Sequence, residues 1–150
     1  MRKFATAQFA GAIACLFVTP LAAQEYRPFP TPQITEAQWK IYFDEVNRAH
    51  SSRKRDFPAE HLIVFEDDPA TLSPETAKQQ AGTSWAFTAP GNPAHPAWIT
   101  RRIVNESGKA TVLQVGYFAG NEAAFAKLFQ SYRALTGRTV KDIEKKLRSP

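Results

Sequence analysis

Two spacings of apolar residues, one helical and one typical of strands, alternate along this chain. After Thr35 the buried-type side chains recur every three or four positions and predict a helix. Thr35 is the expected N-cap of this helix, with Gln38 as its capping-box partner, and Pro58 prevents continuation. The face expected to pack consists of Trp39, Tyr42, Phe43, Val46, Ala49 and His50.

Short runs of β-branched and aromatic residues follow this helix. They predict four strands, over Leu62–Phe65, Ser84–Thr88, Trp98–Val104 and Ala110–Phe118. Gly108 suits the tight loop of the last hairpin. In the long connection after the first strand, a Ser-Pro-Glu sequence predicts a short surface helix over Pro74–Ala81, with Gly82 as its stop.

Two further helices are expected after the sheet. Asn121 caps the first, Gly137 ends it, and its apolar face contains Phe125, Leu128, Phe129, Tyr132 and Leu135. The second begins at Thr139. The predicted fold is therefore an α+β domain with an N-terminal helix, a four-stranded antiparallel sheet and two C-terminal helices packed on one face. Cystatin-like and NTF2-like architectures share this opening, a likeness of fold that carries no function.

The first 23 residues have the order of a secretory signal peptide. Arg2 and Lys3 precede an apolar stretch, and small residues end it, so we expect cleavage after Ala23. Cys15 lies inside the apolar stretch, and the mature chain therefore contains no cysteine. This pattern predicts a bacterial protein that is exported, either periplasmic or secreted.

The mature chain divides into two parts. Residues 24–33 carry prolines on alternate positions and predict an extended arm, either a spacer or a segment laid on the domain. Residues 34–150 form the single α+β domain. Loss of Arg2 and Lys3 lowers the formal net charge from +5 to +3, an ordinary solubility charge that does not indicate a nucleic-acid binder. After signal cleavage no transmembrane segment is expected.

Motifs for catalysis, cofactors and metals are missing from the sequence. There is no nucleophile elbow, P-loop, dinucleotide fingerprint or zinc-type histidine motif. Three adjacent carboxylates, Glu66, Asp67 and Asp68, lack the spacing of a calcium loop and are typical of a solvated turn. No catalytic residue, cofactor or metal ligand is therefore predicted.

The proline-rich loop Pro90–Pro96 is the first candidate for a binding surface. It carries prolines at every third position, which lowers the entropy lost on binding, and it contains His95, which we expect to be exposed. The alternative is an ordinary loop histidine that faces solvent without a role in binding. Trp98 follows the loop directly. As a strand residue it belongs by default to the core, but its place beside His95 makes it a candidate contact as well.

Basic residues provide the second candidate surface. Arg53, Lys54 and Arg55 end the first helix, and a second group decorates the last helix: Lys141, Lys145, Lys146 and Arg148. If these groups adjoin, they form a patch suited to an anionic envelope component. Interleaved acidic residues and the helix dipole favour instead two ordinary solvated surfaces.

These features predict a small exported envelope protein that acts by binding a protein or an envelope component. The alternatives are a small enzyme with its site in a concave sheet, as NTF2-like folds hold, and a structural or assembly factor whose proline arm docks on a partner. A sheet cavity lined by an acid or histidine favours the enzyme, and a filled core favours the binder.

Overall fold

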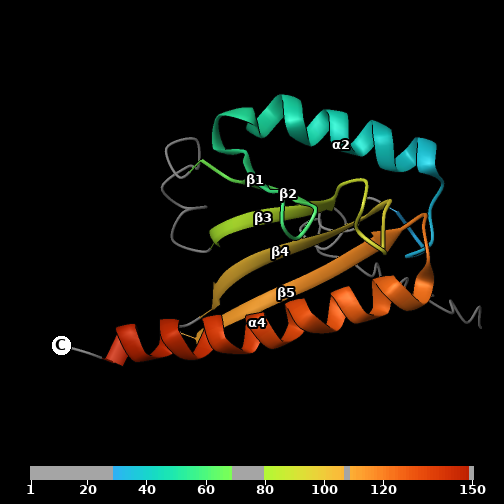
Figure 1. The fold of residues 1–150 in the computed structure, drawn as a ribbon. Helices are drawn as coiled ribbons and strands as arrows, with labels where there is room; N and C mark the ends of the chain where they lie inside the picture. The colour runs from blue at the N-terminus through green and yellow to red at the C-terminus, as the bar shows by residue number, and fades with distance from the viewer. Residues whose placement is uncertain (1–28, 69–79, 107–108, 149–150) are drawn as a thin grey trace, which may run out of the picture.

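The computed structural model describes residues 29–68, 80–106 and 109–148, and the expected signal peptide lies outside these ranges. Within these ranges, five strands form one antiparallel sheet in which each pairs with its neighbour in sequence (Figure 1). The α+β class and the antiparallel sheet are thus confirmed. The elements in chain order are α2 (Glu36–His50), the 3-10 turn η1 (Ser51–Arg53), β1 (Arg55–Phe57), β2 (Leu62–Glu66), β3 (Gln80–Thr88), β4 (Ala97–Glu106), β5 (Lys109–Phe118) and α4 (Glu122–Arg148).

Helix α2 starts where its capping residues predict. The Thr35 side chain accepts a hydrogen bond from the Gln38 backbone N–H at 3.1 Å, and the Gln38 side chain accepts one from the Thr35 N–H at 2.9 Å. These two bonds satisfy backbone donors that have no partner within the helix. Ile34, directly before the cap, is buried.

The prediction of four strands is wrong, because β1 is a fifth. Its three residues, Arg55, Asp56 and Phe57, are all exposed, and a single apolar residue after two charged ones is too weak a signal to predict a strand. Pairing with β2 holds them in place, with Asp56 opposite Ile63. Such an edge strand depends on its neighbour rather than on its own sequence.

Strand β3 starts earlier than expected. It begins at Gln80, so the last two residues of the helix predicted over 74–81 belong to a strand, and the others lie outside the described residues. Gly82, expected to stop that helix, lies within β3 at a φ of 123°. A shift in pairing register between Gln80 and Gly82 marks a bulge there, and a glycine accommodates this backbone most easily.

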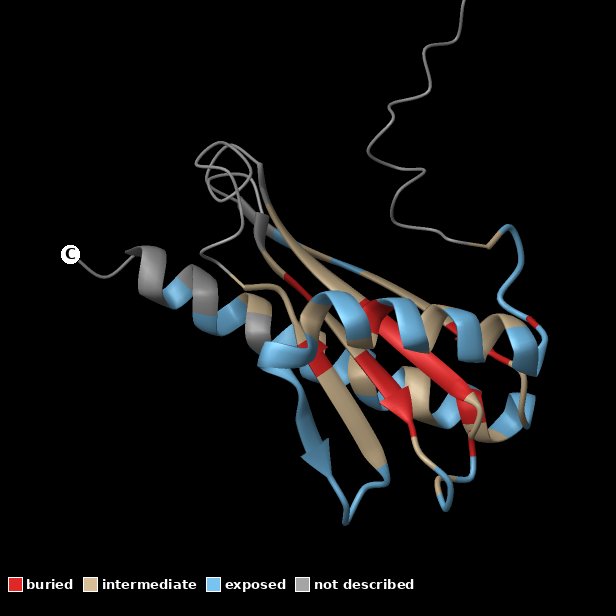
Figure 2. Ribbon diagram, turned by 90° about the horizontal axis from the view of Figure 1, so that it is seen from above, coloured by how far each residue is buried: buried red, intermediate tan, exposed pale blue. Residues whose placement is uncertain are grey.

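The two long helices lie on opposite faces of the sheet, which corrects the prediction that helices cover one face (Figures 1 and 2). Trp98 of β4 packs in the cluster beneath α2, whereas its neighbours Ala97 and Ile99 pack with Phe125 of α4. Successive side chains of a strand point to opposite faces, so a strand that is apolar at consecutive positions is buried on both.

A single helix, α4, replaces the two expected after the sheet. It runs through Gly137, whose φ is not positive and whose position has open space around it. A glycine ends a helix when it takes the left-handed conformation, and here it keeps the helical one. Leu135, expected on the packed face, is 40% exposed. The packed stripe passes instead through Thr136, which hydrogen-bonds Gln114 of β5.

Aromatic rings fill the space between α2 and the sheet. Phe65, Phe87 and Trp98 come from three adjacent strands and have no exposed surface. From α2, the Tyr42 ring stacks on Trp98 at 4.6 Å between centroids, and Phe43 meets Phe87 edge-on at 5.1 Å. Offset and edge-to-face contacts of this kind add to the stabilisation from burial.

The described part of the proline-rich arm lies on the domain. The Phe118 N–H donates to the Pro32 carbonyl, and the Ile34 N–H donates to the Phe118 carbonyl, both at 2.9 Å. These bonds place Gln33 parallel to the end of β5. Phe29 then crosses to the α2 side, where its ring meets Tyr117 at 5.6 Å. Of the two possibilities for the arm, residues 29–33 therefore adopt the docked one.

Candidate binding site at the proline-rich loop

The loop between β3 and β4 is tied to the turn between β1 and β2. The Asn92 side-chain amide donates to the Glu60 carbonyl at 3.0 Å, and its oxygen accepts from the Ala94 N–H at 3.0 Å. Gly91, at a φ of 103°, approaches so closely that a Cβ would come within 2.7 Å of the His61 ring. These contacts fix the loop on an adjacent element.

His95 faces the domain interior. Its Nδ1 lies 2.9 Å from the Thr88 carbonyl, which can only accept, so this nitrogen carries the proton. The ring also meets Trp39 edge-on at 5.1 Å. The histidine therefore joins the loop to β3 and α2. It does not belong to the side chains that form the outer surface of the loop.

Trp98 belongs to the core. It is fully buried, and its ring lies 4.9 Å from Tyr117 and 5.6 Å from Phe87 between centroids. The two residues expected to form one surface are thus divided: His95 is half-buried beside Thr88, and Trp98 is enclosed.

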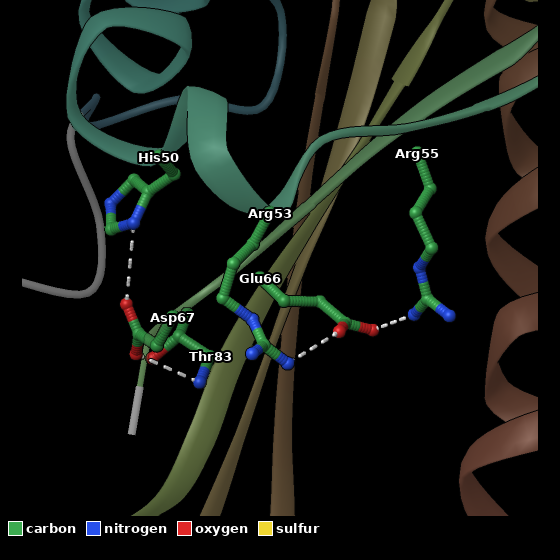
Figure 3. A network of polar contacts seen from close by, with 6 residues as sticks. All are labelled: His50, Arg53, Arg55, Glu66, Asp67 and Thr83. Carbon is green, nitrogen blue, oxygen red and sulfur yellow. Dashed lines mark hydrogen bonds and ion pairs between the residues drawn. The ribbon is translucent and has the colours of Figure 1, made fainter. Parts of the chain in front are cut away.

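The first basic cluster is paired with carboxylates (Figure 3). Glu66 accepts from Arg55, and its other oxygen lies 3.6 Å from Arg53. Lys54 lies 3.3 Å from Asp56. These side chains are partly exposed, so the pairs contribute little to stability, but they reduce the positive field of the cluster.

The two basic clusters lie on different layers of the domain. Arg53, Lys54 and Arg55 follow α2, whereas the second cluster occupies the last turns of α4 beyond the opposite face of the sheet (Figure 1). The members of the second cluster are Lys141, Lys145, Lys146 and Arg148. The structure does not bring these clusters side by side.

The acidic residues at the end of β2 interact with basic side chains and a backbone N–H of the protein itself. Besides Glu66, the Asp67 carboxylate accepts a hydrogen bond from the Thr83 N–H at 2.9 Å and lies 3.8 Å from His50 Nδ1 (Figure 3). The His50 ring stacks on Trp85 at 4.4 Å. Sequence reasoning missed the His50–Asp67 pair because it joins the end of a helix to the end of a strand. In the described ranges, no three metal-ligating side chains gather at one point.

An open groove of about 490 Å³ lies between the loop and α4. Pro93 and Ala94 line it from the loop, and Ala124 and Leu128 line it from the helix. Lys127 is its charged member, and the remaining lining residues are Asn92, Asn121, Ala123 and Ser131. An apolar floor with a few polar groups is typical of a binding site.

Both walls of the groove are held firmly. Ala94 is 1% exposed and packs in the core cluster of Phe118 and Phe125. At the start of α4 the Asn121 side chain accepts from the Ala124 N–H at 2.8 Å, the predicted cap. The sequence thus predicts the loop and the helix cap separately, but it does not predict that the two lie side by side. The spacing of Ala124 and Leu128 on one helix face is the signal that could have suggested the second wall.

Two partly buried tyrosines, Tyr42 and Tyr132, have raised pKa values. Burial raises the pKa of Tyr42, and a hydrogen bond from Trp85 Nε1 at 3.1 Å opposes part of this rise. Burial also raises the pKa of Tyr132, against the lowering effect of Arg101. Both phenols stay protonated at neutral pH, so neither supplies a general base.

No protein-family model, curated protein or solved structure matches this chain. None of the helices in the described ranges combines the length and apolar character needed to cross a membrane.

Proposed function

We propose that this chain is a small exported envelope or periplasmic protein that acts by binding a protein or an envelope component. The filled interior carries this proposal. A concave-sheet enzyme needs a cavity between helix and sheet, and that space is occupied here by Phe65, Phe87 and Trp98, all fully buried. The surface that supports binding lies on the other face of the sheet.

The recognition surface in this proposal is the groove between the loop and α4. Its walls are fixed before binding, so little conformational entropy is lost when a partner docks. Pro93, Ala124 and Leu128 supply apolar contact, and Lys127 adds a positive charge. A partner segment with an apolar side chain next to a carboxylate fits this combination.

Filling the groove tests this assignment. The mature protein serves as bait in an envelope extract, and captured proteins are identified and quantified by mass spectrometry. Ala124→Trp should reduce capture at least tenfold, about 1.4 kcal/mol, because the indole occupies the space of the partner. Ile41→Trp is the matched control, since Ile41 is 60% exposed on α2.

Circular dichroism must show that both variants are folded. Undiminished capture by folded Ala124→Trp protein would move the site away from the groove, first to the basic ends of α2 and α4. Export is tested separately: N-terminal sequencing of the recovered protein should begin at Gln24, and an intact Met1 in soluble cytoplasm would contradict it.

One observation favours a second candidate, a small enzyme. His50 and Asp67 lie 3.8 Å apart, with the imidazole positioned by Trp85. A general base of this kind is a histidine oriented by a hydrogen bond to a carboxylate, and this candidate requires the Nδ1–carboxylate distance to shorten to about 3 Å when a substrate binds. Hydrolysis of a chromogenic ester or phosphate substrate that is lost in Asp67→Asn would support this candidate, and a rate equal to the buffer blank would remove it.

A further inference from the structure

Among the described residues, the outer edge of β5 is unpaired along most of its length. One edge of this strand pairs with β4 from Lys109 to Phe118. On the other edge, the arm pairs only at Phe118, through Pro32 and Ile34, and no other described residue pairs there. The arm residues before Pro32 stay near Gly116, with which they line a cavity, but they make no backbone pair with it, and the Phe29 ring meets Trp98 on the α2 side.

The direction of the backbone groups along this edge follows from Phe118. Its N–H and C=O point outward, since both bond the arm. In an antiparallel ladder these directions alternate, and the β4–β5 register runs without a shift. The N–H and C=O groups of Gly116, Gln114 and Val112 therefore also point outward, which leaves three successive positions for another strand.

Two cavities lie beside these positions. One, of about 220 Å³, is lined by Gly116 and by the arm residues Phe29 to Pro32. The other, of about 470 Å³, lies between Val112 and Gln114 of the strand and Arg133 of α4. An added strand would find room on this line for its side chains as well as for its backbone.

The flank of α4 above the second cavity is positively charged. Arg133, Gly137 and Lys141 are four residues apart and so lie on one side of the helix. Arg133 and Lys141 are exposed, and α4 contains no acidic residue between Glu122 and Asp142. This flank favours a partner that carries carboxylates.

We propose that the outer edge of β5 binds an extended, acidic segment of a partner protein, which adds to the sheet as a further strand. Edge strands of this kind are templates for pairing, and β5 has no proline or charge between Lys109 and Phe118 to prevent it. A second copy of this chain fits less well. Antiparallel pairing of two β5 strands would place both α4 helices on the same face of the extended sheet, where their positively charged flanks would repel each other. This edge is separate from the groove of the proposed function.

A pair of synthetic peptides tests the proposal. The first is a fluorescein-labelled decapeptide that alternates valine with aspartate, and the second has lysine in place of each aspartate. Fluorescence anisotropy should give at least tenfold tighter binding of the acidic peptide. Hydrogen exchange followed by NMR should then slow at the Val112, Gln114 and Gly116 amides. Equal affinity for the two peptides, or protection at other amides only, would overturn the proposal.

Matched variants locate the contact. Val112→Pro removes an outward N–H and leaves the bonds to β4 intact, so it should abolish peptide binding, whereas Val112→Thr should retain it. Arg133→Glu should weaken binding at least tenfold. Arg138→Glu makes the same charge change about 140° around the helix and should alter the affinity less than twofold.

Two further outcomes separate this edge from other sites. Ala124→Trp should bind the acidic peptide normally, so that failure of the groove and failure of the edge are distinguishable. Sedimentation of the protein alone should give a monomer. A dimer that Val112→Pro dissociates would assign the edge to a second copy and contradict the proposal.

Discussion

Gly120 lies just before α4 and Gly137 lies within it, but the space around the two glycines differs. A Cβ at Gly120 would come within 2.4 Å of the His95 carbonyl oxygen and 2.7 Å of its carbon. At Gly137 a Cβ would meet nothing within 4 Å. The first glycine allows the loop to pack on the start of α4, while the second only weakens the helix.

These surroundings predict opposite effects of the same substitution. Gly120→Ala should lower the free energy of unfolding by at least about 2 kcal/mol, because backbone atoms cannot move aside as a flexible side chain can. Gly137→Ala should raise it by about 1 kcal/mol, the difference in helix propensity. Urea denaturation measures both changes. Equal stability of the two variants would contradict the close contact between Gly120 and His95.

At the scale of the elements, the helices are held by aromatic residues on their packed faces. Phe43 of α2 meets Phe65 and Phe87 edge-on, at 5.8 and 5.1 Å. Phe129 of α4 packs beside Gly116, whose missing side chain makes room for its ring. Each ring thus joins its helix to one face of the sheet.

Truncation of either ring should be costly. Phe43→Ala and Phe129→Ala should each lower the free energy of unfolding by about 3–5 kcal/mol, since each leaves a cavity between helix and sheet. Leu135→Ala is the control, because Leu135 is 40% exposed, and it should cost less than about 1 kcal/mol. Denaturant melts of the two phenylalanine variants that match the parent would show that the helices are not anchored in this way.

Helices and strands whose own residues carry a strong signal can be predicted from the sequence. Elements that form only because they pair with another segment cannot. The capping box at Thr35 and the apolar run of β2 act within a few residues, and both were located from the sequence. The exposed β1 exists through its pairing with β2. The opposite placement of α2 and α4 differs from the expectation that helices cover one face, because the consecutive apolar residues Ala97, Trp98 and Ile99 pack on both faces of the sheet.

The same distinction applies to the candidate site. Prolines and Asn121 indicate a rigid loop and a helix start, but their position around one groove brings together residues far apart in the chain. Burial of Trp98 follows from its strand position, whereas the inward turn of His95 follows from a bond to Thr88 that no spacing reveals.

At the scale of the whole molecule, the two tyrosines connect stability to pH. Their pKa values are raised from 10.0 in the folded protein, mainly by burial. Above pH 10 the unfolded chain loses these protons first, so the folded state binds more protons than the unfolded state. The free energy of unfolding must therefore fall as pH rises through this range, and the stabilisation is complete only below pH 10.

The loss of stability caused by the tyrosines can be distinguished from the loss caused by lysines, which titrate in the same pH range. The free energy of unfolding should fall less steeply above pH 10 in a Tyr42→Phe, Tyr132→Phe protein than in the parent. Below pH 9 the two curves should run parallel, offset by the lost hydrogen bond with Trp85. Identical slopes above pH 10 would show that neither phenol is protected by the fold.

The order of the strands in the sheet, which is also their order in the sequence, has a consequence for folding kinetics. Each strand finds its partner a short distance along the chain, so the sheet can grow hairpin by hairpin with little loop-closure entropy at each step. The arm is the exception, because the Tyr117 hydroxyl meets the Phe29 carbonyl across 88 positions. We therefore expect the arm to dock after the sheet has formed, so that a chain whose sheet has just formed presents the full length of β5 before its own N-terminal segment occupies one end.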